Sequence, residues 1–551
     1  MKEKIRQLVI EACLELYDLE IIAELTRPDS EHGDFASNVA MQLAKPLGSS
    51  PRDMAQEIVG VLKENELIAL AGVAGPGFIN ISVTDQTLIE SLKHKPAKSM
   101  AGMNVIAEYS DPNVFKVLHV GHLYTSVVGD AISNVIEDQG GIVHRVNFGG
   151  DVGLHAAKAM WGIVEKLGGE SPNGLNGVEE SKRADWISEA YVAGNSAYES
   201  GDSKAEIISI NKRIYDLHKK DAQESDFASI YWTCRQWCYD YFDAFYDRIG
   251  TSFEKYYPES ITAPLGLKTV KEQLKNGIYE ESDGAVVFDG EKHGLHTRVF
   301  INSNGLPTYE AKDVGLAMMK WQDYNFDLSI MITGNDIKEY MKVVLKSIEQ
   351  YEPEIAKRSV HKTHGMVKLK GGEKMSSRLG NAPKAVDILD EVRRLIGKED
   401  NSTMLAAVKY GFLKQGIGQD IAFDINESVA TEGNSGPYLQ YAHARAVSIL
   451  GKSTQELQEF SIDTELDSSE RTLLRKITEY PEIIELATKE LAPHHICTYL
   501  YELAQTFNRF YENSKVIGSD REAERLQLVK VYANTLKKGL TLLGIHAPQQ
   551  M

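Results

Sequence analysis

Cysteine is scarce, since the 551-residue chain contains only four. So few thiols in so long a chain exclude a fold that depends on a disulfide framework. Cys234 and Cys238 lie four residues apart in YWTCRQWC and would share one face of a helix. A metal site there would need two further ligands, and Cys13 and Cys497 are remote in sequence. Buried helix thiols are the favoured interpretation, a metal site is the alternative, and we expect no resident metal ion.

Long hydrophobic runs are also missing. Although 42% of the residues are hydrophobic, no stretch approaches the roughly 18 uninterrupted apolar residues that a membrane-spanning helix needs. Near the N-terminus, Glu3, Glu11 and Glu15 interrupt the apolar residues. Acidic residues there argue against a secretory signal or a transit peptide. We therefore expect a cytoplasmic protein that does not associate with membranes.

Basic residues are outnumbered, with 60 Lys and Arg against 79 Asp and Glu and a net charge of −19. A protein that binds nucleic acid without specificity is normally basic, so the charge balance argues against that class. It leaves room for a protein that holds one folded RNA through local basic patches.

The chain is too long for one hydrophobic core and divides into three regions. Residues 1–98 predict a small α+β domain, in which GFINISV alternates like a strand. Residues 99–400 predict an α/β domain, and residues 401–551 have the periodicity of an all-α bundle.

The α/β region begins as a strand–helix–strand unit. NVIAEYSD (104–111) and IVHRVNF (142–148) predict strands, with a helical pattern from His122 to Gln139 between them. This order is typical of a Rossmann-like parallel sheet that binds nucleotides. A charged, mostly helical insertion occupies about residues 155–255. The α/β alternation is then expected to resume through DGAVVF, TRVFIN, LSIMITG and GMVKLKGG.

Two histidines flank a glycine in Leu118-His119-Val120-Gly121-His122, between the predicted strand and the predicted helix. A helix N-terminus attracts anions, and Gly121 would let a base or ribose approach the backbone closely. Imidazole groups there can donate to phosphate oxygens as charge builds on leaving pyrophosphate. The alternative is a pair of ordinary capping histidines.

A second signal lies about 250 residues later in GGEKMSSR (371–378). Glycines make a loop that can close, and cations beside hydroxyl groups can stabilise a triphosphate during adenylyl transfer. The side chains concerned are Lys374, Met375, Ser376, Ser377 and Arg378. Taken alone, this run is more often a solvated turn.

Together the two motifs resemble the HIGH and KMSKS signatures of class I aminoacyl-tRNA synthetases. Other segments are similar to the arginyl-tRNA synthetase family in particular. They are EHGDFASNVAMQLAK in the N-terminal region, EYSDPN before HVGH, NFGGDVG, GLPTYEAKDVG, and NSGPYLQYAHAR near the start of the helical region. The resemblance covers nearly the whole chain and is loose only in the 155–255 insertion and the last helices.

The resemblance implies an arginine site. Glu259, Tyr309 and Asp313 would bind the guanidinium, which presents five donors in a planar fork and is best met by carboxylates. Glu108 and Asn113 would hold the α-ammonium and carboxylate groups. The resemblance also implies further site residues: His122 beside the arginine, Asn147, Gly150 and Asp151 in a nearby turn, and Gly365, Met366 and Val367 beside ATP. Taken singly, each of these is more often a solvated or capping residue.

Three positions depart from the family pattern. Arg378 replaces the second lysine of KMSKS and keeps the positive charge. Gly334-Asn335-Asp336-Ile337 lacks a histidine common in relatives, which leaves open whether this strand end binds the amino acid. His364 stands where an aromatic residue is common, so it would either stack on adenine or lie on a surface strand.

The implied reaction has two steps. Arginine attacks the α-phosphate of ATP to give arginyl-adenylate, and the 3′ end of tRNA(Arg) then takes the acyl group. Mg²⁺ is expected mainly through the ATP phosphates. Relatives need bound tRNA before they activate arginine, and family habit favours a monomer.

The C-terminal bundle is expected to bind the anticodon, with aromatic and cationic side chains suited to unstacked bases. The candidates are Tyr438, Gln440, Tyr441, His443, Arg445, Phe507, Asn508, Arg509, Phe510 and Tyr511. At least half of the aromatic residues are expected to be bundle core. The alternatives for the whole chain are another class I synthetase or a related nucleotidyltransferase, and a non-catalytic RNA-binding paralogue.

Overall fold

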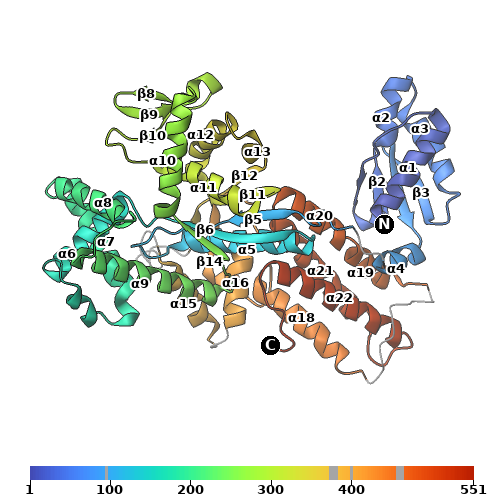
Figure 1. The fold of residues 1–551 in the computed structure, drawn as a ribbon. Coiled ribbons are helices and arrows are strands. Elements are labelled where there is room, and N and C mark those ends of the chain that lie inside the picture. The colour runs from blue at the N-terminus through green and yellow to red at the C-terminus, as the bar shows by residue number, and fades with distance from the viewer. Residues whose placement is uncertain (94–96, 371–382, 398–400, 454–464) are drawn as a thin grey trace.

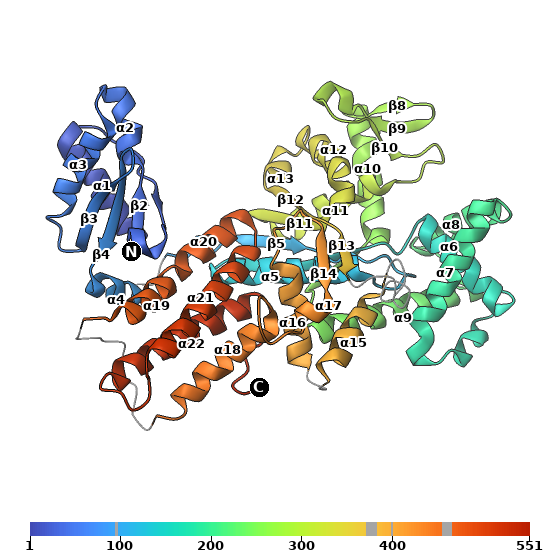
Figure 2. The ribbon, with the colours of Figure 1, turned by 180° about the vertical axis from the view of Figure 1, so that it is seen from behind.

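The computed structural model describes residues 1–93, 97–370, 383–397, 401–453 and 465–551. A parallel sheet lies at the centre, a helical lobe (α6–α9) at one end, and a small N-terminal domain at the other (Figure 1). A helical bundle runs beside the sheet toward the N-terminal domain, as the view from behind shows (Figure 2). Among the described residues, no helix is long and apolar enough to cross a membrane.

The N-terminal domain is an antiparallel sheet, ordered β1-β2-β4-β3, covered by helices. Ser50 caps α3 and accepts a hydrogen bond from the Asp53 backbone. Pro51 occupies the first turn, where a backbone N–H would have no acceptor within the helix, so its missing N–H costs nothing. The expected strand GFINISV is confirmed as β4. The elements are α1 (Lys2–Tyr17), β1 (Leu25–Thr26), η1 (Ser30–His32), β2 (Phe35–Ser37), α2 (Val39–Leu47), α3 (Pro51–Leu62), β3 (Ile68–Ala74), β4 (Phe78–Val83) and α4 (Asp85–Lys93).

The central sheet is parallel in every pairing and is ordered β12-β11-β5-β6-β7. Its strands are β5 (Asn104–Glu108), β6 (Ile142–Gly149), β7 (Lys255–Pro258), β11 (Leu328–Gly334) and β12 (Ser359–His364), with α5 (Val120–Asp138) between β5 and β6. From β5 the chain proceeds to one side, and later strands are added on the other side. The carboxyl ends of β5 and β11 therefore flank the point where strand order reverses, which is where ligands bind in such sheets.

Two long segments outside the sheet precede and follow β7 in the chain. The first is the expected helical lobe: α6 (Leu154–Leu167), η2 (Pro172–Gly177), η3 (Glu180–Lys182), α7 (Arg183–Ser200), α8 (Lys204–Leu217) and α9 (Asp226–Ile249). The second comprises α10 (Glu259–Lys275), β8 (Glu280–Ser282), β9 (Ala285–Phe288), η4 (Gly290–His293), β10 (Arg298–Ile301) and α11 (Tyr309–Tyr324).

The expectation that the α/β alternation resumes through DGAVVF and TRVFIN is wrong. Their strands, β9 and β10, form a separate antiparallel sheet with β8. GMVKLKGG contributes β13 (Val367–Lys370), which pairs with β14 (Ile421–Asp424) and also lies outside the central sheet. Only LSIMITG, as β11, joins that sheet. An alternating pattern shows that a segment is a strand without showing which strand it pairs with.

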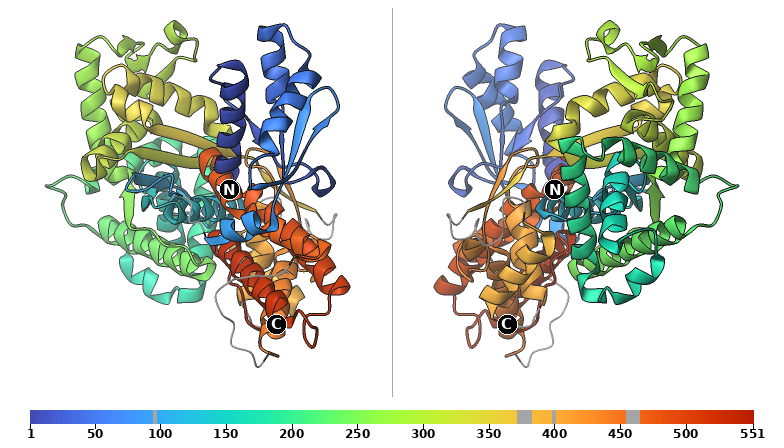
Figure 3. Two further views of the ribbon diagram at one scale, coloured as in Figure 1. Left: turned by 90° about the vertical axis from the view of Figure 1, so that its right-hand side faces the viewer. Right: turned by 90° about the vertical axis from the view of Figure 1, so that its left-hand side faces the viewer.

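The remaining elements are mainly helices. They are η5 (Asn335–Ile337), α12 (Lys338–Glu349), α13 (Pro353–Lys357), α15 (Ala385–Ile396), α16 (Asn401–Leu413), α17 (Ile425–Ser428), α18 (Gly436–Leu450), α19 (Ser468–Thr478), α20 (Tyr480–Glu490), α21 (His494–Asn513) and α22 (Glu522–Leu542). Helices α16, α20 and α22 pack against α5, which joins the bundle to the sheet. The N-terminal domain lies above the bundle helices in both views of Figure 3, and its α4 packs against α19 of the bundle.

Candidate active site

The turn that follows β5 is strained. Ser110, Asp111 and Phe115 have positive φ angles of 75°, 46° and 67°, a region that residues with side chains rarely occupy. Tyr246 of α9 holds the turn through a 2.8 Å hydrogen bond with the Ser110 hydroxyl. Asn147 is buried and donates both to the Tyr246 hydroxyl and to the Tyr109 carbonyl. Strain of this kind persists where neighbours enforce it, and it concentrates at functional sites.

His119 is the N-cap of α5, and its Nδ1 accepts a 3.0 Å hydrogen bond from the Gly121 N–H. His122 Nδ1 accepts from the His119 N–H at 3.2 Å. A side chain at Gly121 would approach the His119 ring to 2.8 Å. Here Gly121 makes room for the capping ring, whereas the sequence predicts that it admits a base or ribose.

Both imidazoles of this motif are uncharged at neutral pH. Desolvation and the charge of Lys116 lower the pKa of His119, and burial, His119 and Lys116 lower that of His122 well below its usual value. A neutral ring that accepts at Nδ1 carries its proton on Nε2. The capping bonds therefore fix both tautomers and leave two Nε2–H donors.

Glu259 begins α10 and is 3% exposed. The turn after β6 holds this helix start, since Asp151 accepts from the Ser260 N–H at 2.9 Å and from its hydroxyl at 2.7 Å. Asp151 is fully buried and is paired with Arg235 of α9 at 2.9 Å. In this arrangement Asp151 positions Glu259 and is not itself open to a ligand.

Lys312 of α11 donates to Glu259 at 2.5 Å, and both side chains are buried. Burial raises the pKa of Glu259, and Lys312 opposes that shift. Lys312 is a site residue that the sequence motifs do not identify. It lies beside Asp313 in the TYEAKDVG motif, but a lysine in a charged helix is ordinarily expected to be solvent-exposed.

Helices α10 and α11 touch backbone to backbone. A Cβ at Gly266 would lie 1.7 Å from the Ala311 carbonyl oxygen, and one at Gly315 would lie 2.1 Å from that of Thr262. This contact brings Glu259 on one helix beside Lys312 and Asp313 on the other. The glycine of the D-x-G motif is thus explained by packing.

Asp313 is half-buried and accepts a hydrogen bond from the Tyr340 hydroxyl of α12. Burial raises the pKa of Asp313 to about 8; the Tyr340 bond opposes the shift, and Glu108 and Glu259 add to it. Tyr309, one turn earlier, is 53% exposed.

Glu108 ends β5 and forms a buried ion pair with Lys320. In this structure its carboxylate already has a cation, so a role in holding the α-ammonium group would require that pair to rearrange. Asn113 is half-buried, and a Cβ at Gly150 would lie 2.1 Å from its side-chain oxygen. Gly150 thereby leaves Asn113 room beside the turn.

His364 ends β12, is buried, and bonds to the Thr125 hydroxyl at 2.6 Å with its ring against Tyr124. The alternative of a surface strand residue is therefore wrong. Gly365 is buried against the backbone of Gln419, and Met366 is 64% exposed. The loop residues Lys374, Met375, Ser376, Ser377 and Arg378 lie outside the described residues.

The four cysteines are buried free thiols. Burial raises the pKa of Cys234 and of Cys238, to about 12 for the latter. The expectation of buried helix thiols is confirmed.

The candidate RNA residues of α18 face in two directions. Gln440 and His443 are buried, and they bond to the carbonyl oxygens of His546 and Pro548, both at 2.8 Å. Both side chains hold the C-terminal tail on the helix, so a direct contact with RNA stays a prediction that would require the tail to move.

The outer face of α18 is different. Arg445 lies 4.5 Å from the Tyr511 ring centre, and Tyr441 is 49% exposed. A cavity of about 700 Å³ lies here, lined by Tyr441, Arg445, Lys452 and the tail residues 549–551. Asn508 links Tyr438 and Arg445, and Arg509 donates to Thr506 within its own helix.

Comparisons with known proteins agree with this architecture. Residues 84–411 match the family "tRNA synthetases class I (R), catalytic domain". Residues 1–83 match "Arginyl tRNA synthetase N terminal domain", and residues 439–551 match "DALR anticodon binding domain". Fold and family match together define a class I aminoacyl-tRNA synthetase.

The particular family follows from the relatives. The arginine–tRNA ligase of Bacteroides thetaiotaomicron is 28% identical and covers 100% of both chains. That of Porphyromonas gingivalis is 29% identical over 96% of this chain and 95% of its own. The chain belongs to the arginyl-tRNA synthetase family.

Solved structures show the same fold. The arginyl-tRNA synthetase of Thermus thermophilus superimposes with a TM-score of 0.82 at 22% identity and covers 100% of both chains. That of Plasmodium falciparum gives 0.80 at 22% identity, covering 100% of this chain and 99% of its own.

Proposed function

We propose that the chain carries out the arginine–tRNA ligase reaction of its family in the crevice at the carboxyl ends of β5 and β11. ATP activates the arginine carboxylate, pyrophosphate leaves, and the 3′ end of tRNA(Arg) accepts the arginyl group. One observation carries the choice of site. The glycine-mediated contact of α10 and α11 places the carboxylates of Glu259 and Asp313 close enough for their charges to interact, and Asp313 interacts in the same way with Asp111 of the strained turn.

The two carboxylates supply the specificity. A guanidinium can bond to two acceptors at once through its planar fork, whereas an ammonium is a point charge. A site built for the fork rejects lysine, because lysine leaves buried acceptors unpaired. Tyr309 is exposed one turn before Asp313 and can close over the bound side chain.

The histidine pair handles the phosphates. His119 and His122 each offer an Nε2–H donor at the N-terminus of α5, where the helix dipole also favours negative charge. Because the rings are neutral and already fixed by capping bonds, they can donate to charge that develops on the leaving pyrophosphate without reorganising. ATP is proposed to enter as its Mg²⁺ complex, with the ion held mainly by phosphate oxygens.

The outer face of α18, with the cavity beside the C-terminal tail, is proposed to receive anticodon bases. Tyr441 offers an exposed ring and Arg445 a cation, a combination suited to an unstacked base. Gln440 and His443 act indirectly by holding the tail that forms one wall. We also propose that the protein acts as a monomer in the cytoplasm; sedimentation equilibrium tests the monomeric state.

The test is aminoacylation of total tRNA with labelled arginine, lysine, cysteine and glutamine. We expect charging with arginine alone. Glu259→Gln should raise the KM for arginine strongly, whereas Glu272→Gln, on the exposed face of the same helix, should not. Charging with another amino acid would point to a different class I synthetase, and no charging would favour a non-catalytic RNA-binding paralogue.

A further inference from the structure

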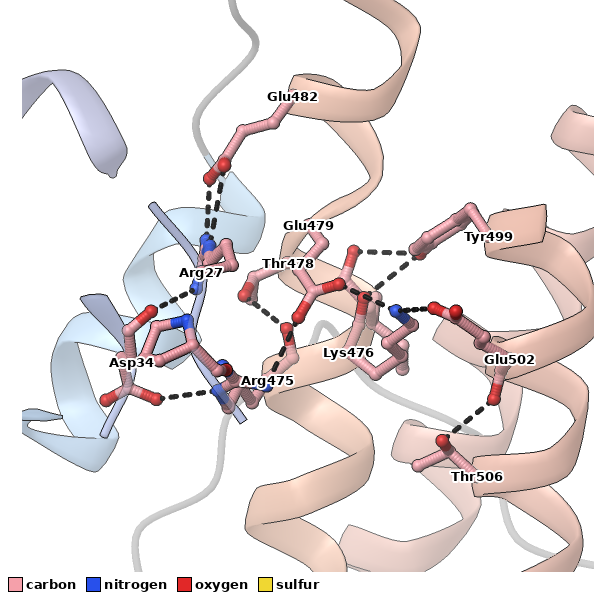
Figure 4. A network of polar contacts seen from close by, with 12 residues as sticks. Arg27, Asp34, Arg475, Lys476, Thr478, Glu479, Glu482, Tyr499, Glu502 and Thr506 are labelled. Carbon is pink, nitrogen blue, oxygen red and sulfur yellow. Dashed lines mark hydrogen bonds and ion pairs between the residues drawn. The ribbon is translucent and has the colours of Figure 1, made fainter. Parts of the chain in front are cut away.

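The N-terminal domain is joined to the C-terminal bundle by a network of charged side chains (Figure 4). Its members come from residues 27–34 on one side and from α19 and α20 on the other. Since α4 also packs against α19, two regions that are remote in sequence form one interface. We call five of these side chains the interdomain clasp, of which Figure 4 labels all except Arg471: Arg27, Asp34, Arg471, Arg475 and Glu482.

Asp34 is the centre of the clasp. Its side chain is only 1% exposed, and it accepts from Arg471 at 2.8 Å and lies 3.3 Å from Arg475. Within its own domain it also accepts a 2.8 Å hydrogen bond from the Val83 N–H. A buried carboxylate needs such partners, because an unpaired charge away from water is strongly unfavourable.

The same two arginines bind backbone of the N-terminal domain. Arg471 donates to the Val83 carbonyl at 2.7 Å, and Arg475 donates to the Pro28 carbonyl at 2.6 Å. A backbone carbonyl is held rigidly within its domain and accepts best near its own plane. These two bonds therefore constrain the orientation of the N-terminal domain on the bundle as well as its contact.

A second ion pair has its charges reversed, with the base in the N-terminal domain and the acid in the bundle. Arg27 of the N-terminal domain donates to Glu482 of α20 at 2.6 Å, with its guanidinium 4.1 Å from the Phe35 ring centre. Each side of the interface therefore contributes both an acid and a base. This reciprocal charge pattern specifies one docking geometry.

Asp34 belongs to the EHGDFASN segment. Gly33 has a φ of +100°, and a Cβ there would lie 2.9 Å from the Ile81 carbonyl oxygen, so glycine is required to bring Asp34 against β4. Glu31 and His32 of the same segment are exposed. The motif thus divides into an outward part and an inward part that reaches the bundle.

We propose that Asp34 is a positioning residue for tRNA: through Arg471 and Arg475 it holds the N-terminal domain on the bundle, so that both bind one folded RNA as a rigid unit. This inference rests on the proposed function. A docked domain adds its contacts to the RNA at a high effective concentration, and a released domain loses most of that advantage.

The test compares Asp34→Asn and Arg471→Gln with a control, Asp53→Asn, which alters an exposed acid of the same domain. Asparagine keeps the acceptor for the Val83 N–H, and Arg471→Gln leaves the N-terminal domain intact. Each clasp variant should raise the KM for tRNA about tenfold, with kcat and the KM for arginine within about twofold. The control should match the wild type.

Two further measurements separate undocking from unfolding. Small-angle scattering should show a larger radius of gyration in both clasp variants, while hydrogen exchange should leave the Val83 amide protected. A lost Val83 protection in Asp34→Asn would make Asp34 a folding residue of its own domain and overturn the proposal, as would an unchanged KM for tRNA.

Failure of the proposed function can be distinguished from failure of the positioning role of Asp34. If the wild type charges no arginine, filter binding of total tRNA still compares the variants with the control. Weaker binding by both clasp variants would support the positioning role, and equal binding would overturn it.

Discussion

Arginine binding should depend on pH through Asp313. Burial raises the pKa of this carboxyl to about 8 in the ligand-free protein, so at pH 7 about nine-tenths of it is protonated. A guanidinium needs the carboxylate, and binding must therefore release a proton. By linkage, affinity rises with pH up to the pKa and levels off above it. Between pH 7 and pH 9 the Kd for arginine should fall about tenfold, or about 1.4 kcal/mol.

Isothermal titration calorimetry in buffers of different ionisation enthalpy measures both the Kd and the number of protons released. We expect nearly one proton to be released per bound arginine at pH 7 and almost none from Asp313 at pH 9. Asp313→Asn should weaken binding and remove the pH dependence that belongs to this group. Titration of the ligand's own α-amino group persists in the variant, so it serves as the internal control. A Kd that is flat from pH 6.5 to 9 in the wild type would refute the assignment.

Three other substitutions test separate parts of the site. His119→Asn keeps a good N-cap but removes the Nε2–H donor, so kcat should fall about 10²–10³-fold with an unchanged melting temperature; a normal kcat would exclude His119 from catalysis. Lys312→Met leaves Glu259 buried without its cation, which should cost about 3–5 kcal/mol of stability, and arginine should raise the melting temperature of this variant more than that of the wild type. Gln440→Leu should raise the KM for tRNA through the released tail while the KM for arginine stays constant, as steady-state aminoacylation would show.

The sequence predicts those parts of the fold whose patterns are local. The strands around residues 104 and 142, the helix between them and the helical lobe all follow from periodicity, and the structure has them at nearly the expected bounds. Strand partners are not local. The segments DGAVVF and TRVFIN read as strands, yet nothing in their alternation distinguishes a separate antiparallel sheet from the central one.

For the site, motifs identify residues but not their surroundings. Gln440 and His443 carry side chains suited to RNA, and only the position of residues 546–548 reveals that they hold the tail. His364 resembles a surface residue until Thr125 and Tyr124 are seen to enclose it. Such contacts join segments more than 100 residues apart, so no window of sequence contains both partners.

The acids of the motifs fall into two groups once their cations are known. Glu108 pairs with Lys320, Asp151 with Arg235, and Glu259 with Lys312. A buried acid with a resident cation is already compensated, so an incoming guanidinium must displace or share that cation.

Asp313 accepts a hydrogen bond from the phenol of Tyr340 instead, and burial raises its pKa although that bond opposes the shift. Of these acids, it is the one whose ionisation a bound guanidinium would most favour, because burial and, to a smaller extent, the neighbouring carboxylates disfavour its charge. Arginine would therefore complete the charge balance of the crevice as a counterion, whereas a neutral amino acid would leave Asp313 protonated. Selectivity for a cationic side chain then follows from Asp313, whose partner in this structure is a neutral phenol, and selectivity for the planar shape follows from Glu259 on the adjoining helix.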